Sequence, residues 1–172
     1  MEIRSAPLFA EYWANFRGRT RRVALAIPPD RLEWSWQPGK WTFGDLLRHL
    51  AGIERDMYAE NVQGRPSRYP GHGPELAEGF EAVLGYLDRK HAESLEIFRS
   101  LTAEQLDAKC QTPAGTPITT WKWLRAMVEH EAHHRGQIYQ MLGVIGVATP
   151  PLYGLTEEEV RARSTYDSMT IV

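Results

Sequence analysis

The stretch VEHEAHHRGQIYQML, residues 128–142, carries a dense group of imidazole and carboxylate side chains. Neutral imidazole is a preferred ligand of divalent transition metals, and two histidines four residues apart share one face of a helix. His130 and His134 have this spacing. With Glu131 they also match the HExxH motif of zinc peptidases, in which the glutamate is a general base. The stretch therefore has three possible interpretations: a metal-binding histidine pair on a helix, the active-site motif of a zinc peptidase, or a solvated polar patch.

Helical geometry separates the three histidines of this stretch. At about 100° per residue, one apolar face forms from Leu124, Met127, Val128, Ile138, Leu142 and Ile145. His130 and His134 lie together on the flank of that face, whereas His133 falls outside it, toward solvent. Short HxxxH motifs often occur by chance, so the pair needs support from elsewhere in the chain.

A third ligand would have to come from another helix, and two histidines compete for this position. His49 lies at the edge of an apolar stripe formed by Leu46, Leu50, Ile53 and Met57. His91 lies near the centre of a second stripe, formed by Phe80, Leu84, Leu87, Leu95 and Phe98. Periodicity slightly favours His91, although a lone histidine in such a position is more often a hydrogen-bonded core residue. His72, in the loop sequence PGHGP, is expected to be solvated.

Glu131 and Arg135 are also four residues apart and fall close to the apolar face of their helix. Burial of either charge alone would be costly, so we expect them to pair with each other or with other polar groups. The alternative for Glu131 is the catalytic role of a general base. That role would require the HExxH interpretation to hold.

The whole chain is predicted to be all-α. Helical periodicity covers residues 7–27, 42–64, 75–100 and a last long segment from 119 or 120 to 143 or 146. Thr42 is a natural N-cap, with Asp45 in the first turn, and Pro74 suits the first position of a helix. The spacing of these segments predicts a four-helix bundle that forms a single domain over residues 1–172.

Shorter elements are expected between and after the long helices. TAEQL, residues 102–106, indicates one short turn, and CQTPAGTPIT, residues 110–119, an irregular or hairpin-like loop. Thr156 and Glu159 form a capping-box pattern, which predicts a short C-terminal helix.

Composition argues against several partners. The net charge of −2 does not suggest a nucleic-acid or anionic-membrane partner, and the run Arg17, Arg19, Arg21 and Arg22 is interpreted as a solvated helix face. No apolar stretch has the length of a membrane span or a signal-peptide core. The single cysteine, Cys110, fits a reducing cytoplasm.

TFGDLLRHLAGIE, residues 42–54, and LRAMVEHEAHHRGQIYQML, residues 124–142, together resemble the DinB-like family of bacterial four-helix-bundle metalloproteins. EWSWQPGKWT and GVATPPLY resemble the segments that flank these helices in the family. The resemblance implies an up-down-down-up bundle, frequently a homodimer, with a three-histidine site for a divalent metal. Its ligands map to His49, His130 and His134, which selects His49 over His91.

Three histidines leave a coordination position open, as in catalytic rather than structural metal sites. Zinc, nickel, iron and manganese all accept this donor set. Characterised DinB-like relatives include enzymes that use low-molecular-weight thiols such as bacillithiol, mycothiol or glutathione. The resemblance therefore implies a thiol S-transferase that acts on small electrophilic molecules.

Two alternatives stay open. The first is a zinc hydrolase that uses His130, Glu131 and His134, with a third ligand from Glu157, Glu158 or Glu159; the near absence of strand patterns argues against a peptidase. The second is a stress-related metal-binding bundle without catalytic activity.

Overall fold

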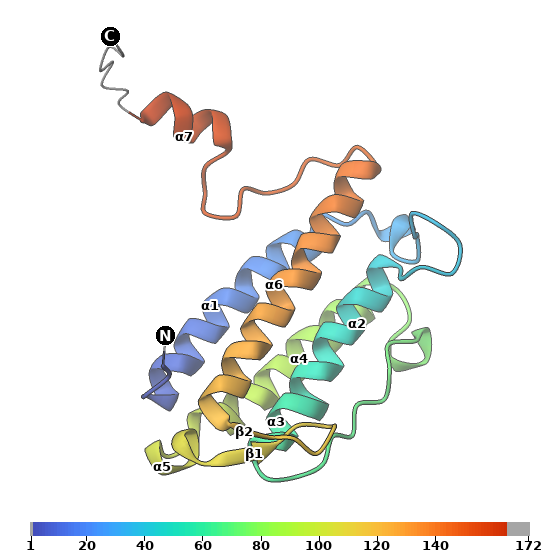
Figure 1. Ribbon diagram of the computed structural model, residues 1–172. Helices are drawn as coiled ribbons and strands as arrows, with labels where there is room; N and C mark the ends of the chain where they lie inside the picture. The colour runs from blue at the N-terminus through green and yellow to red at the C-terminus, as the bar shows by residue number, and fades with distance from the viewer. Residues whose placement is uncertain (1, 165–172) are drawn as a thin grey trace.

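The computed structural model describes residues 2–164 and is dominated by four long helices that pack side by side (Figure 1). They are α1 (Ala6–Ala24), α2 (Phe43–Ile53), α4 (Phe80–Arg99) and α6 (Thr120–Val144). The helices form a ring in which α1 packs on α4, α4 on α2, α2 on α6 and α6 on α1. Helices α1 and α6 run in one direction along the bundle, and α2 and α4 run in the other (Figure 1). The predicted up-down-down-up bundle is confirmed.

Helix α2 begins as the sequence predicts and ends in an unusual way. Thr42 accepts a hydrogen bond from the backbone N–H of Asp45, and the Asp45 carboxylate accepts one from the backbone N–H of Thr42, which completes a capping box. At its C-terminal end the helix widens into a π-helical turn, Glu54–Tyr58, before one further turn, α3 (Ala59–Asn61). Such wide turns occur frequently near functional sites.

Because α2 and α4 are parallel neighbours, the chain between them must return along the bundle (Figure 1). It does so through residues 62–79, which include a short 3₁₀ turn, Pro74–Leu76. The prediction that the third helix starts at residue 75 is wrong by five residues. Gly79 has a φ of +81°, and this left-handed conformation separates the 3₁₀ turn from the first residue of α4.

The shorter elements follow the sequence patterns. Residues 103–107 form α5 (Ala103–Asp107), and an antiparallel hairpin pairs β1 (Lys109–Gln111) with β2 (Pro117–Thr119). A 3₁₀ turn, Pro29–Arg31, follows α1, and the capping box at Thr156 begins α7 (Glu157–Arg163). Within residues 2–164, every helix is too short or too polar to cross a membrane.

The bundle core consists of two apolar clusters with a polar layer between them. One cluster contains Val23, Leu47, Leu87 and Ile138, and the other contains Trp13, Phe98, Leu106 and Leu124. Each helix passes from one cluster to the other through buried or half-buried polar residues. These are Arg17 and Thr20 on α1, Glu54 after α2, His91 on α4, and His130, Glu131, His134 and Arg135 on α6. All four helices therefore contribute polar side chains to this layer.

Candidate metal centre

Three histidines from two helices converge within the polar layer. His49 comes from α2, and His130 and His134 come from α6. Nε2 of His130 lies 3.1 Å from Nε2 of His49 and 3.1 Å from Nε2 of His134. Two nitrogen ligands at about 2.0–2.1 Å from one ion, at tetrahedral or octahedral angles, are separated by about 2.9–3.4 Å. Nε2 of His130 therefore has ligand spacing from both of its neighbours, and one ligand atom from each of the three histidines lies within 4.8 Å of the others.

Hydrogen bonds on the far side of the rings indicate which nitrogen atoms carry protons. Nδ1 of His134 lies 2.7 Å from Oε1 of Gln137, which can only accept, so this Nδ1 carries the proton. Nδ1 of His49 lies 2.6 Å from the hydroxyl of Tyr69. A neutral imidazole that is protonated at Nδ1 has a lone pair on Nε2. The Gln137 contact therefore favours a lone pair on Nε2 of His134 directed at the cluster, and the Tyr69 hydroxyl can accept from Nδ1 of His49 in the same tautomer.

Burial keeps these histidines neutral. Desolvation and the neighbouring imidazoles lower the pKa of His49 to about 3 and that of His130 to about 4, and desolvation also lowers the pKa of His134. Metal ligation requires unprotonated imidazole. At neutral pH the donor set therefore fits a divalent transition metal, and zinc, nickel, iron and manganese all accept it.

Trp41 forms an aromatic wall beside the cluster. Its ring centroid lies 4.8 Å from that of His49, and it stacks on His134 at 5.6 Å with an interplanar angle of 15°. An open pocket of about 1040 Å³ lies next to His134 and Trp41. Its apolar lining includes Trp36, Trp41, Leu46, Met141 and Val144, and its polar lining includes Lys40, Gln137 and Gln140. A volume of this size accommodates a small organic substrate.

Glu131 belongs to a different environment from the histidine beside it. The Thr20 hydroxyl donates to its Oε1 at 2.6 Å, and the Arg17 guanidinium lies 2.8 Å from its Oε2. Glu131 and Arg135 form no direct ion pair with each other. Each instead contacts other groups, which was the second possibility: Glu131 pairs with Arg17 and Thr20, and Arg135 packs over the ring of Phe16. Glu131 is buried, and its polar partners come from α1 and not from the histidine cluster.

Arg17 also contradicts the interpretation of the basic run on α1 as a solvated face. Its side chain is only 4% exposed and forms ion pairs with Glu54 as well as Glu131. Burial alone would raise the pKa of Glu54, but Arg17, His91 and the Trp13 indole together lower it. Burial raises the pKa of Glu131, and the Arg17 charge offsets this increase only in part. One guanidinium thus serves two buried carboxylates.

The other histidines lie outside the cluster. His91 bonds through Nδ1 to Oε1 of Glu54 at 2.9 Å, which is the behaviour of a hydrogen-bonded core histidine. His133 is exposed, as helical geometry predicts. His72 was expected to be solvated, but it is half-buried because its ring packs on Trp41 with centroids 4.3 Å apart. Within residues 2–164, no carboxylate joins the group, and Glu157, Glu158 and Glu159 are exposed on α7.

Several residues that shape the site were not identified from the sequence. Gln137 follows His134 by three residues on one helix, so helical spacing could have indicated it. Tyr69 lies in the irregular segment 62–79 and Trp41 in a loop, where no periodicity relates a side chain to the site. These contacts depend on how the loops pack on the bundle.

Comparison with known proteins identifies the family. The model of the DinB superfamily matches residues 12–138, and the chain belongs to this superfamily. Two Bacillus subtilis (strain 168) proteins, YjoA and YrdA, are each 24% identical to it. The YjoA alignment covers 83% of this chain and 92% of YjoA, and the YrdA alignment covers 88% and 89%.

Solved structures share the fold. A DinB-like protein from Bacillus cereus ATCC 10987 superimposes with a TM-score of 0.72 at 17% identity, covering 83% of this chain and 94% of that protein. YfiT from Bacillus subtilis superimposes with a TM-score of 0.66 at 17% identity, covering 83% and 89%. YfiT is described as a probable metal-dependent hydrolase with an unusual four-helix bundle topology.

Proposed function

We propose that the protein is a divalent-metal-dependent enzyme in which His49, His130 and His134 hold the metal. The observation that carries this proposal is the convergence of three Nε2 atoms while the outer nitrogens of His49 and His134 are hydrogen-bonded to Tyr69 and Gln137. Without an ion, the single Nε2 proton that a neutral His130 can carry would satisfy only one of its two Nε2 contacts fully. A bound divalent ion lowers the pKa of a thiol or water that coordinates it and so supplies a nucleophile near neutral pH.

The reaction that we favour is S-transfer from a low-molecular-weight thiol to a small electrophile. Across residues 2–164, the hydrogen bonds and ion pairs of the three histidines include no carboxylate that could deprotonate water. A thiol is much more acidic than water and has less need of such a base. The mainly apolar pocket beside Trp41 would hold the electrophile, and Lys40 or Gln140 at its edge would contact a polar substituent.

A metal-dependent hydrolase is the second candidate, because YfiT carries that description. The HExxH version of this candidate is disfavoured because Glu131 is bonded to Thr20 and Arg17 in the core. We expect Glu131→Gln to retain full metal content and any hydrolytic activity of the protein. Loss of hydrolysis with retained metal in this variant would instead support Glu131 as the general base.

The proposal is tested with protein purified without a histidine tag. After loading with zinc, nickel, iron or manganese, thiol consumption is measured with several low-molecular-weight thiols and an activated aryl chloride. Ester and amide hydrolysis is measured in parallel without thiol. We expect stoichiometric metal, thiol transfer that chelators abolish, and loss of both in His49→Ala.

His91→Gln serves as the control, because glutamine can still donate a hydrogen bond to Glu54. It should retain the metal. Wild-type protein without stoichiometric metal, or a His49→Ala variant with unchanged metal content, would contradict the proposed centre and favour a non-catalytic bundle. Metal-dependent hydrolysis without thiol transfer would favour the second candidate.

A further inference from the structure

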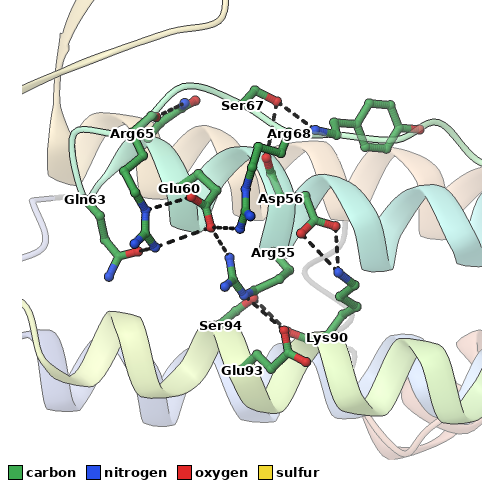
Figure 2. A network of polar contacts seen from close by, with 12 residues as sticks. Arg55, Asp56, Glu60, Gln63, Arg65, Ser67, Arg68, Lys90, Glu93 and Ser94 are labelled. Carbon is green, nitrogen blue, oxygen red and sulfur yellow. Dashed lines mark hydrogen bonds and ion pairs between the residues drawn. The ribbon is translucent and has the colours of Figure 1, made fainter.

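The segment that returns from α2 to α4 is fixed to the π-helical turn by an ion-pair cluster (Figure 2). At its centre is Glu60, a carboxylate that is only 1% exposed. Arg65 lies 2.7 Å and Arg68 2.8 Å from its oxygen atoms, and Arg55 approaches it from the helix side. The backbone N–H of Arg68 also donates to the carbonyl of Asp56 at 2.7 Å. The chain is therefore held in place immediately before Tyr69.

Gly52 gives the ring of Tyr69 a close approach to α2. A Cβ atom at position 52 would lie 3.2 Å from Cε2 and 3.3 Å from Cδ2 of Tyr69, closer than ordinary van der Waals contact. Glycine in the interior of a helix is unfavourable compared with alanine. The helix thus has its most flexible residue at the position where the Tyr69 ring needs space, one turn after His49.

The ring places its hydroxyl against the outer nitrogen of His49. The two rings are nearly perpendicular, at 84°, with the Tyr69 oxygen 2.6 Å from Nδ1. When Nε2 uses its lone pair to bind a metal ion, the neutral ring carries its proton on Nδ1, and the Tyr69 oxygen accepts a hydrogen bond from it. Such outer contacts fix the tautomer and the orientation of a ligating histidine.

We propose that Tyr69, held by the Glu60 cluster and seated on Gly52, is a positioning residue that fixes the ring and tautomer of His49 for metal binding. This inference rests on the proposed function, because it assigns Tyr69 a role toward the metal. It makes the returning segment a part of the metal centre. The two helices that supply the ligands are therefore not enough to fix the geometry of the metal centre.

The first test removes only the hydroxyl. Tyr69→Phe keeps the ring on Gly52 but leaves Nδ1 of His49 without an acceptor. We expect the Co²⁺ and Zn²⁺ dissociation constants, measured by competition with a chelator, to rise about tenfold or more. The visible absorption bands of bound Co²⁺ should shift, while the melting temperature of the metal-free protein changes little.

Tyr86→Phe is the matched control, because the Tyr86 hydroxyl also lies near Gly52 but makes no hydrogen bond to the three histidines. It should bind Co²⁺ with the wild-type affinity and spectrum. A Tyr69→Phe variant with those wild-type properties would overturn the inference. So would an equal loss of affinity in both variants.

The second test moves the ring and keeps the hydroxyl. Gly52→Ala should displace Tyr69 by a few tenths of an ångström and so weaken Co²⁺ binding. This loss of affinity is expected even if the higher helix propensity of alanine raises the melting temperature of the protein. Gly85→Ala is its control on α4, because a Cβ atom there meets no other atom within 4 Å. It should raise the melting temperature without altering Co²⁺ affinity. Unchanged affinity in Gly52→Ala would contradict the seating of Tyr69 on this glycine.

The two levels of proposal fail in different ways. If the wild-type protein binds no divalent metal, the proposed function fails, and with it the role of Tyr69. If the wild-type protein binds Co²⁺ through His49, His130 and His134 but is insensitive to Tyr69→Phe, only the positioning role fails.

Discussion

Arg17 is a buried cation that pairs with two buried carboxylates beside the histidine cluster. It pairs with Glu54 and Glu131, and its Nη2 also donates to the carbonyl oxygen of Leu50 at 3.3 Å. These partners come from the two helices that supply the histidines. The guanidinium therefore links α1 to both of them, at the level of the bundle where the metal centre lies.

Removing this cation should be costly. Arg17→Met would leave the buried carboxylates of Glu54 and Glu131 without their main positive partner, and we expect the free energy of unfolding to fall by about 3–5 kcal/mol. Urea denaturation of the metal-free protein measures this change. Arg21→Met is the control, because Arg21 and its partner Asp88 are both more than 40% exposed. It should cost less than about 1 kcal/mol, and equal effects would contradict a special role for Arg17.

At the scale of elements, the parallel arrangement of α2 and α4 determines where the returning segment lies. The chain must travel back along the bundle between these two helices, and it passes the outer side of His49 on the way. The Glu60 cluster ties the start of the segment to the π-helical turn (Figure 2). Loop packing and metal geometry are therefore connected through the same eighteen residues, 62–79.

Neutralising Glu60 should loosen this segment selectively. Glu60→Gln keeps the size of the side chain but leaves three arginines with a neutral and therefore weaker hydrogen-bond acceptor. We expect the free energy of unfolding to fall by about 2–3 kcal/mol. Limited proteolysis should show faster cleavage within residues 62–79. The control is Glu93→Gln, which removes the 46% exposed partner of Arg55. If both variants are cleaved at the wild-type rate, the Glu60 cluster does not anchor the segment.

At the scale of the whole molecule, burial of the histidine cluster makes stability depend on pH. Folding lowers the pKa of His49, His130 and His134 below the value of about 6.5 that they have when unfolded. Below about pH 6.5 the unfolded chain therefore binds more protons than the folded one. This difference persists as the pH falls toward the folded pKa values, about 3 for His49 and about 4 for His130.

The metal-free protein should consequently lose stability as the pH falls from about 6.5 toward about 4. Urea midpoints at about pH 7 and about pH 5 measure the loss, and this range lies above the ordinary pKa values of Asp and Glu. Glu131, whose pKa burial raises, is present in the wild type and in the variant below, so the comparison isolates the imidazole. His49→Leu should reduce the loss because one of the three protonation sites is removed. Equal wild-type stability at both pH values would contradict the burial of neutral imidazoles.

The homodimer implied by the family resemblance and the cytoplasmic location suggested by the single cysteine remain predictions. The oligomeric state can be measured directly. Sedimentation equilibrium of the metal-loaded and metal-free protein gives its mass and shows whether assembly depends on the metal centre. A monomer in both states would contradict the dimer.

The sequence by itself determined the features that depend on neighbouring residues. The N-cap at Thr42, the capping box at Thr156, the hairpin-like loop of residues 110–119 and the separation of His130 and His134 from His133 all follow from local geometry. The helix periodicities also led to the four-helix bundle, since each apolar stripe needs partners. Local spacing and side-chain chemistry suffice for such features.

Only the tertiary structure decided which distant residues meet. Periodicity slightly favoured His91, and the family resemblance selected His49. The packing of α2 against α6 brings His49 to His130, whereas the packing of α4 against the π-helical turn directs His91 to Glu54. The partner of Glu131 comes from α1, and Tyr69 comes from an irregular loop. Such contacts cannot be predicted from periodicity, because they depend on the relative rotation of whole helices and on the path of the returning chain.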